Sequence, residues 1–429
     1  MNTTAEKLFD LIEKGVSPYQ VVEEAEKRLK EAGFEKLEFH TAWGLTGGKS
    51  YYMIHHGTTL IAFTIPKTLY YRESFRMAAA HTDFPCLRIK PNPEMEMSGY
   101  QQLNVEVYGG AILNTWLDRP LGIAGTVALA SDEVFAPRIV HFSSECPVAV
   151  IPNIAIHMNP ALNKGVELNK QKDMIPIVGI AGEEMQKKDF FYEYLAKELQ
   201  LSKEEILDFD LYLYNTEMPE TVGMGKELIS APRLDNLTSV QALLDGIITG
   251  EREDGINLIA LFDHEEIGSR TKQGAGSMLL RDVVEKIQIS LGRDACQVKE
   301  ALYQSMLLSV DVAHAMHPNQ NQKADVTNQP VLNRGFCIKE SGNQSYATDC
   351  EVVAIVEQIC KKEMIAYQKY VNRSDIAGGS TLGAIAGSLM PVQTVDIGVP
   401  ILAMHSAREL MGADDMAALS RFVGSYFSI

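Results

Sequence analysis

The chain has 429 residues, of which 46% are hydrophobic and 22% are charged, a composition typical of a globular protein with a sizeable core. Lys and Arg number 39 and Asp and Glu number 56, so the formal net charge is −17. Such an acidic chain repels phosphate backbones and anionic lipids, which argues against nucleic-acid and membrane partners. The six cysteines form no CxxC pair, no apolar run approaches the roughly 20 residues of a membrane span, and the N-terminus does not resemble a secretion signal. We therefore expect a cytoplasmic protein.

The N-terminal segment has the pattern of helices followed by a β-hairpin. Ser17 is a suitable N-cap, Pro18 suits the first helical position, and Gly33 ends the helical run. The apolar runs 51–56 and 58–65 are separated at Gly57, which predicts two antiparallel strands.

Short apolar runs recur along the rest of the chain and predict an α/β sheet. The runs 257–262, 306–310 and 392–399 are separated by helical patterns, which favours parallel strands. The run 75–80 predicts another buried element, whose end presents His81. Polar residues follow each run, and open α/β sheets carry their sites at the carboxyl ends of their strands.

The middle of the chain has a different pattern. Short β runs with turn signals occupy 103–110, 122–130, 137–142 and 148–152, with one helical stretch at 187–201. We expect a β-rich domain at 91–230, inserted into a discontinuous catalytic domain formed by 1–90 and 231–429.

The polar residues near the strand ends suit a metal centre. Singly, each has an ordinary explanation, such as a helix N-cap for Asp235 or a core histidine for His405. Together they supply two imidazoles and several carboxylates, which is the ligand chemistry of zinc. The candidate ligands are His81, Asp235, Glu266, Asp311 and His405. If Asp235 bridges two ions, each ion has one histidine and one carboxylate of its own, with room for a bridging water.

Other residues beside this set suit catalysis. Glu265 is left over from the ligands, and a carboxylate beside a metal-bridging water is suited to be a general base. Asp83 follows His81 by two residues and could fix the tautomer of its ring. His314 competes as a ligand, and we expect it to lie behind the ligands or to face substrate. His264 and His317 are interpreted as structural.

Five segments in this order resemble the aspartyl aminopeptidase family of metallopeptidases, peptidase family M18. They are AAHTDFPCLRIKP, SAPRLDNL, DHEEIGS, DVAHAMHPN and VDIGVPILAMHSARELMG. The resemblance implies a di-zinc exopeptidase fold with a mostly parallel central sheet, interrupted by a β-rich dimerisation domain. It also implies dimers that assemble into a homododecamer.

The resemblance implies the same ligands and the same base, and it adds substrate-binding residues. His157 would reach into the active site of a neighbouring subunit and steady the substrate. Lys339 and Tyr346, in CIKESGNQSYATD, would bind an acidic substrate side chain. Ser345 stands where the family pattern has arginine, and IAGGSTLG (376–383) also departs from that pattern.

We therefore predict a zinc-dependent aminopeptidase that acts on short peptides, with Asp or Glu preferred at the N-terminus and two Zn²⁺ per subunit. Co²⁺ or Mn²⁺ could occupy one site. One alternative is an aminopeptidase of neutral or broad specificity, and another is a deacylase or carboxypeptidase on the same metal core. A non-catalytic binding protein is disfavoured, because the base and all five ligands occur together.

Overall fold

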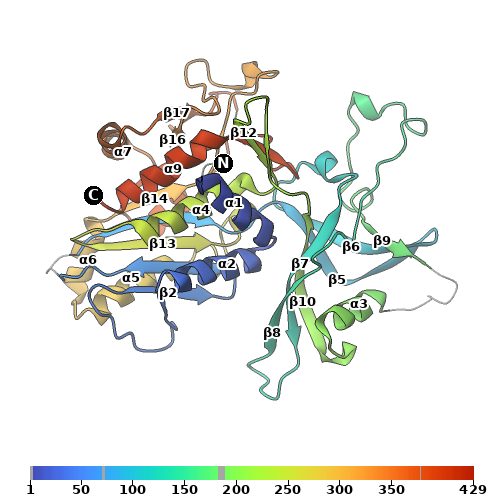
Figure 1. Ribbon diagram of the computed structural model, residues 1–429, viewed down its shortest axis with the longest axis horizontal. Coiled ribbons are helices and arrows are strands. Elements are labelled where there is room, and N and C mark those ends of the chain that lie inside the picture. Colours follow the sequence, from blue (N-terminus) through green and yellow to red (C-terminus); the bar gives the residue numbers. More distant parts are fainter. Residues whose placement is uncertain (1–2, 70–72, 182–188, 377) are drawn as a thin grey trace. The chain divides into compact units, whose positions relative to one another are not determined.

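The computed structural model describes residues 3–69, 73–181, 189–376 and 378–429 (Figure 1). The chain divides into two compact units. The first unit comprises Met1–Asp83, Pro219–Met404 and Glu409–Ile429, and the second comprises Phe84–Met218 with His405–Arg408. The second unit overlaps the expected insertion, but it begins earlier and its long segment ends earlier.

Helices are distributed over both units. They are α1 (Thr3–Lys14), α2 (Pro18–Glu31), α3 (Phe190–Leu199), α4 (Leu234–Thr249), α5 (Leu279–Ser290), α6 (Ala295–Tyr303), α7 (Cys350–Glu363), α8 (Leu382–Leu389) and α9 (Ala413–Tyr426). None of the helices in the described ranges has the length and apolar character needed to cross a membrane.

A large mixed sheet forms the centre of the first unit. Its strands, in spatial order, are β1 (Glu35–Lys36), β2 (Ser50–His55), β3 (Thr59–Thr64), β13 (Ile256–Phe262), β4 (Phe75–His81), β14 (Met306–Val310), β18 (Gln393–Gly398), β16 (Phe336–Glu340) and β17 (Tyr367–Val371). The neighbours β13, β4, β14 and β18 are mutually parallel. The predicted α/β class with a mostly parallel sheet is confirmed.

The residues predicted to begin and end the N-terminal helix have the expected positions. The Ser17 side chain accepts the backbone N–H of Tyr19, Pro18 opens α2, and Gly33 has a φ of 85° just after the helix. Strands β2 and β3 pair antiparallel, which confirms the predicted hairpin.

The parallel strands place three chain segments at one edge of the sheet. His81 is the last residue of β4 and pairs in register with Phe262, the last residue of β13. Strand β14 ends at Val310, one residue before Asp311. The carboxyl ends of these strands therefore meet, as the sequence predicted.

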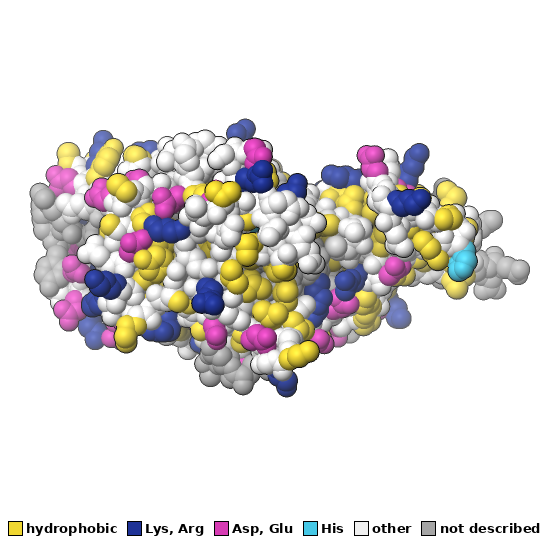
Figure 2. Space-filling view, turned by 90° about the horizontal axis from the view of Figure 1, so that it is seen from above, with side chains coloured by type: hydrophobic (Ala, Val, Ile, Leu, Met, Phe, Trp, Pro, Cys, Tyr) yellow, Lys and Arg dark blue, Asp and Glu magenta, His cyan; other side chains and the backbone are white. Residues whose placement is uncertain are grey.

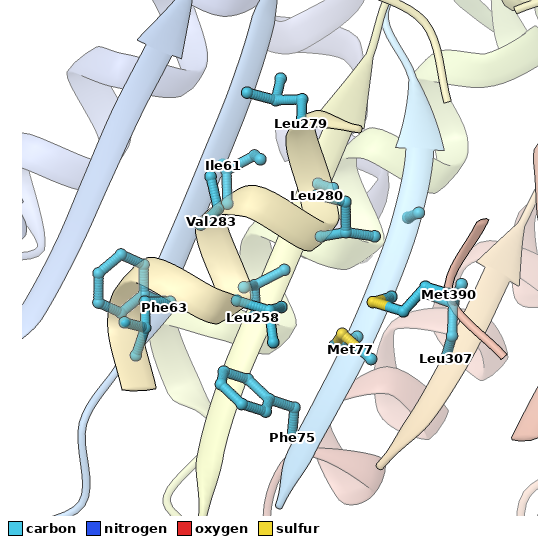
Figure 3. Packing of buried hydrophobic residues seen from close by; sticks show 14 of the residues in the cluster. Ile61, Phe63, Phe75, Met77, Leu258, Leu279, Leu280, Val283, Leu307 and Met390 are labelled. Atoms are coloured by element: carbon cyan, nitrogen blue, oxygen red, sulfur yellow. The ribbon is translucent and has the colours of Figure 1, made fainter. Parts of the chain in front are cut away.

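The core packs between the sheet and helices on one of its faces (Figure 3). Phe75 and Met77 of β4 lie beside Leu258 of β13, and Leu280 and Val283 of α5 cover them. On the first unit's other side, α4 contacts α9, β4 and β13 (Figure 1). The sheet is thus covered on both faces, which explains why its central strands are almost wholly apolar.

A small sheet also belongs to the first unit. Its strands, in spatial order, are β11 (Glu220–Val222), β12 (Leu228–Ala231), β20 (Glu409–Gly412), β19 (Pro400–Leu402) and β15 (Ala313–His314). It joins the chain segments that follow β14 and β18, since β15 and β19 pair parallel.

The second unit is built on an antiparallel sheet. Its strands, in spatial order, are β8 (Arg138–Ser143), β7 (Leu121–Leu129), β10 (Ile206–Asn215), β5 (Cys86–Met97), β6 (Tyr100–Tyr108) and β9 (Ile177–Ile180). The prediction of a strand at 148–152 is wrong, because only isolated bridges form there, at Ala149 and Val150. The helix predicted at 187–201 is α3, and residues 187–188 lie outside the described residues.

Acidic and basic side chains are interspersed on the face in Figure 2, with hydrophobic side chains between them. The net charge of −17 is therefore not gathered into one acidic patch on this face.

Candidate metal centre

His81 lies at the centre of a cluster of carboxylates in the first unit. Its Nε2 is 3.4 Å from Asp235 Oδ1, 3.5 Å from Asp311 Oδ1 and 4.0 Å from Glu265 Oε2. Possible ligand atoms of His81, Asp235 and Glu266 all lie within 4.8 Å of one another. Four of the five predicted ligands, and the predicted base, therefore converge on one point.

Asp235 reaches this point because the start of α4 is not helical. Arg233 has a φ of 59°, and Asp235 has a φ of −81° and a ψ of 102°. The backbone N–H of Asp235 donates to Glu409 Oε2 at 3.0 Å. Asp235 is therefore held by a hydrogen bond at its own backbone, rather than acting as an ordinary helix cap.

The loop after β13 presents two glutamates in succession. His264 and Gly268 both have left-handed φ values, 62° and 99°, on either side of a short 3₁₀ turn. Glu265 and Glu266 donate their backbone N–H groups to Asp83 Oδ1 and Oδ2, each at 3.1 Å. The sharp turn lets adjacent glutamates face the cluster from different directions.

Asp83 also contacts the ring of His81. His81 Nδ1 lies 3.0 Å from the backbone oxygen of Asp83 and 3.4 Å from its Oδ1. The shorter of these contacts is to the main chain. An Nδ1–H that donates to this oxygen leaves Nε2 as the ring nitrogen that faces the carboxylates.

The charges in the cluster perturb one another strongly. Burial raises the pKa of Glu265 to about 8, His81 opposes the rise, and the charges of Asp311, Asp83 and Asp235 add to it. Burial, followed by the charge of Asp235, raises the pKa of Glu266 well above its usual range. Burial lowers the pKa of His81, but hydrogen bonds to the neighbouring carboxylates outweigh it and raise that pKa well above its usual value.

This donor set fits a divalent cation. Carboxylates that repel one another around a single imidazole are stabilised when a positive ion lies between them. A mixture of nitrogen and oxygen donors favours zinc among the common metals, with cobalt and manganese also tolerated. His81, Asp235, Glu266 and Asp311 are the residues that would hold it.

Asp311 is in contact with a buried lysine, Lys339. Lys339 on β16 has only 2% of its side chain exposed, and its Nζ lies 3.6 Å from Asp311 Oδ2. The same ammonium donates to the backbone oxygens of Asp311 and Val312. Lys339 is therefore a buried lysine that contacts both the side chain and the main chain of Asp311.

Two other predicted substrate-binding residues lie near Lys339. The ring of Tyr346 is buried, and the Lys339 ammonium lies 5.0 Å from its centroid. His314 is exposed, and its ring centroid is 6.1 Å from that of Tyr370. Their contact with substrate stays a prediction.

His405 and His157 belong to the second unit. The backbone oxygen of His405 accepts the N–H of Ile112, and its Nδ1 lies 3.3 Å from the oxygen of Gly110. His157 is exposed in a turn. The role of His405 as a ligand and that of His157 in a neighbouring subunit stay predictions.

Sequence reasoning missed two buried acids beside the site. Glu409 fixes the backbone of Asp235, and its only sequence signal was its place in the segment SARELMG. Asp396 lies inside the apolar strand β18, where it accepts hydrogen bonds from Thr381 Oγ1 and from the backbone N–H of Ala347. An acidic residue within an apolar strand was the signal that could have identified it.

Comparisons with known proteins show the family of this chain. The chain matches the model of the aminopeptidase I zinc metalloprotease family (M18) over residues 11–427. It is 43% identical to a probable M18 family aminopeptidase 2 of Clostridium novyi over 412 residues, covering 96% of this chain and 95% of that protein.

Solved structures give the same result. The structure of mApe1 from Chaetomium thermophilum superposes with a TM-score of 0.88 at 28% identity, over 99% of this chain and 97% of that one. The mApe1 dodecamer of S. cerevisiae gives a TM-score of 0.86 at 26% identity, over 99% and 96%. The chain therefore belongs to the M18 family of zinc aminopeptidases, as the five sequence segments had indicated.

Proposed function

We propose that this protein is an aminopeptidase that uses two zinc ions to remove single residues from the free N-terminus of short peptides. The observation that carries the proposal is the convergence of Asp235, Asp311 and Glu265 on His81 Nε2, within 3.4–4.0 Å. Asp235, the most buried of the three carboxylates, would hold zinc together with His81, Glu266 and Asp311. His405 would complete the ligand set.

The chain's own residues supply the proton transfers. Bound zinc would polarise the scissile carbonyl and lower the pKa of water at the site. Glu265 takes the proton from the attacking water and later delivers it to the leaving amine. Its position suits this role, because its backbone N–H is held by Asp83 while 16% of its side chain is exposed to solvent.

The proposed preference is for an N-terminal Asp or Glu. It rests on the resemblance of the segment 337–349 to the family pattern and on the position of that segment beside Asp311. A neutral or broad preference is the alternative, because Ser345 departs from the family pattern. A deacylase on the same metal core is a second alternative.

The proposed assembly is a homodimer that builds a homododecamer. Support comes from mApe1 of S. cerevisiae, which is described as a dodecamer and is similar to 99% of this chain. In such an assembly the exposed His157 would serve a neighbouring subunit. The cytoplasm is the proposed location, in keeping with six cysteines that are free thiols.

Hydrolysis of aminoacyl anilides tests this function. The panel carries Asp, Glu, Leu, Lys or Met, each with a free and with an acetylated amine, and is offered to zinc-loaded and chelator-treated protein. We expect cleavage of free-amine substrates only, led by Asp and Glu, and only with metal. Cleavage led by neutral residues would contradict the acidic preference alone. Cleavage of acetylated substrates would favour the deacylase, and no cleavage at any metal loading would contradict the proposal.

A further inference from the structure

Lys339 is a buried cation that already donates hydrogen bonds inside the protein. It lies in β16, between β18 and β17, with 2% of its side chain exposed. Its ammonium donates to the backbone oxygens of Asp311 at 3.1 Å and Val312 at 3.0 Å. A lysine has three N–H donors, so two of them are used by main-chain acceptors.

The third donor faces the carboxylate of Asp311. The distance from Nζ to Oδ2 is 3.6 Å, which is an ion pair rather than a hydrogen bond. The ring of Tyr346 covers the ammonium at 5.0 Å from its centroid. The ammonium is therefore enclosed by oxygen acceptors and an aromatic face.

The fold gives this cation a second negative neighbour. Lys339 pairs in register with Asp396 on the antiparallel strand β18. Asp396 is fully buried and is held by Thr381 and by the backbone of Ala347. A buried ammonium is costly unless such partners surround it, and removing it would leave their charges uncompensated.

We propose that Lys339 is a positioning residue that fixes Asp311 for metal binding and is not a receptor for the substrate's side-chain carboxylate. Lys339 holds Asp311 at both its backbone oxygen and its side chain, so the second carboxylate oxygen, Oδ1, faces His81 at 3.5 Å. This inference rests on the proposed function, in which Asp311 is a zinc ligand. It differs from the substrate-binding role that the family resemblance implies for Lys339.

Zinc binding separates the two roles without any use of activity. The variant is Lys339→Met, which keeps an unbranched chain and removes the charge. Its matched control is Lys369→Met on the neighbouring strand β17, where Lys369 is 35% exposed and pairs with Glu340 and Glu357. Zinc affinity is measured by competition with a chromophoric chelator. We expect about 10–100-fold weaker binding for Lys339→Met and no change for Lys369→Met.

Steady-state kinetics add a second readout. A positioning role lowers kcat by a similar factor for Asp and Leu anilides and leaves the ratio of their KM values unchanged. Unchanged zinc affinity, with a rise in KM for the Asp substrate alone, would overturn the proposal. If wild-type protein cleaves neither substrate, the proposed function fails, but the zinc measurement still decides the role of Lys339.

A second variant guards against misfolding of Lys339→Met. Lys339→Met combined with Asp396→Asn removes one buried charge of each sign and leaves Asp311 without its cation. We expect this double variant to fold, as judged by circular dichroism, and to keep the weakened zinc binding. Recovery of wild-type zinc affinity in the folded double variant would overturn the proposal.

Discussion

The carboxylate of Asp83 holds the backbone of Glu265: Asp83 Oδ1 accepts the N–H of Glu265 at 3.1 Å. Its other oxygen accepts the N–H of Glu266 at the same distance, and its backbone oxygen lies 3.0 Å from His81 Nδ1. One residue therefore links the ring of a proposed ligand to the turn that carries the proposed base. The sequence suggested only the contact between Asp83 and the ring of His81.

Replacing Asp83 by Asn should impair catalysis more than folding. An amide has a single acceptor oxygen, so one of the two N–H groups would face an NH₂ group instead. We expect kcat to fall about 10–100-fold, the usual cost of losing such a supporting residue. The measurement is kcat on a free-amine anilide at equal zinc content.

Asp294→Asn is a suitable control for this change. Asp294 also accepts two backbone N–H groups, those of Cys296 and Gln297, but it does so at the start of α6. We expect its kcat to stay within about twofold of wild type, because it lies on no element that carries a proposed ligand. Equal losses in both variants would mean that Asp83 acts only through stability.

Zinc should stabilise the protein and displace protons from it. Repulsion among the carboxylates is relieved by a cation, and Glu265, with its pKa raised to about 8, holds a proton at pH 7 in the metal-free site. Stabilisation of about 4 kcal/mol is expected when free zinc exceeds its Kd a thousandfold.

Calorimetry checks both parts of this prediction. The melting temperature should rise on zinc addition, and titrations in two buffers with different ionisation enthalpies should show net proton release at pH 7. A melting temperature that does not respond to zinc, or proton uptake on binding, would contradict a carboxylate-rich metal site here.

Asp415, which is not one of the candidate site residues, should make the stability of the protein depend on pH. Burial raises its pKa to about 7, the backbone N–H groups of Asn333 and Gly335 oppose the rise, and Asp414 adds to it. The folded state then binds the proton more tightly than the unfolded state, whose pKa is near 3.8. The stabilisation is complete below pH 3.8 and is lost as the pH rises to 7, by at most about 1.4 kcal/mol per pH unit.

The Asp415→Asn variant isolates this contribution. The difference in melting temperature, wild type minus variant, should fall between pH 5 and pH 8. A difference that stays constant or grows over that range would show that the carboxyl is not protonated in the fold.

The grouping of the candidate ligands at one edge of the sheet was predictable from the sequence, because a potential metal-ligating residue lies at or just after the end of each apolar strand. His81 follows three alanines, and Asp311 follows Val310 directly. Parallel strands bring such ends together whatever their separation along the chain. The turn at Glu265 was also indicated by the sequence, because two successive acidic residues after an apolar strand are not expected within the apolar core.

The surroundings of Lys339 could not be predicted in the same way. Lys339 pairs with Asp396 on the neighbouring strand, and its ammonium contacts Asp311. Both contacts join segments that are far apart in the chain. A lysine is usually exposed, so nothing in its neighbourhood in the sequence indicated burial. The hydrogen bond from Asp235 to Glu409 was hidden for the same reason, because it depends on the small sheet that carries β20.

The most direct test of a zinc aminopeptidase with Glu265 as its base is the activity of Glu265→Gln at full zinc loading. The control is Glu285→Gln, which removes an exposed carboxylate on α5 that pairs only with Arg281 among the ion pairs of the described residues. We predict that Glu265→Gln binds zinc, folds, and loses at least about a hundredfold in kcat on free-amine anilides, while Glu285→Gln keeps wild-type activity. A zinc-loaded Glu265→Gln protein with wild-type kcat would contradict the mechanism.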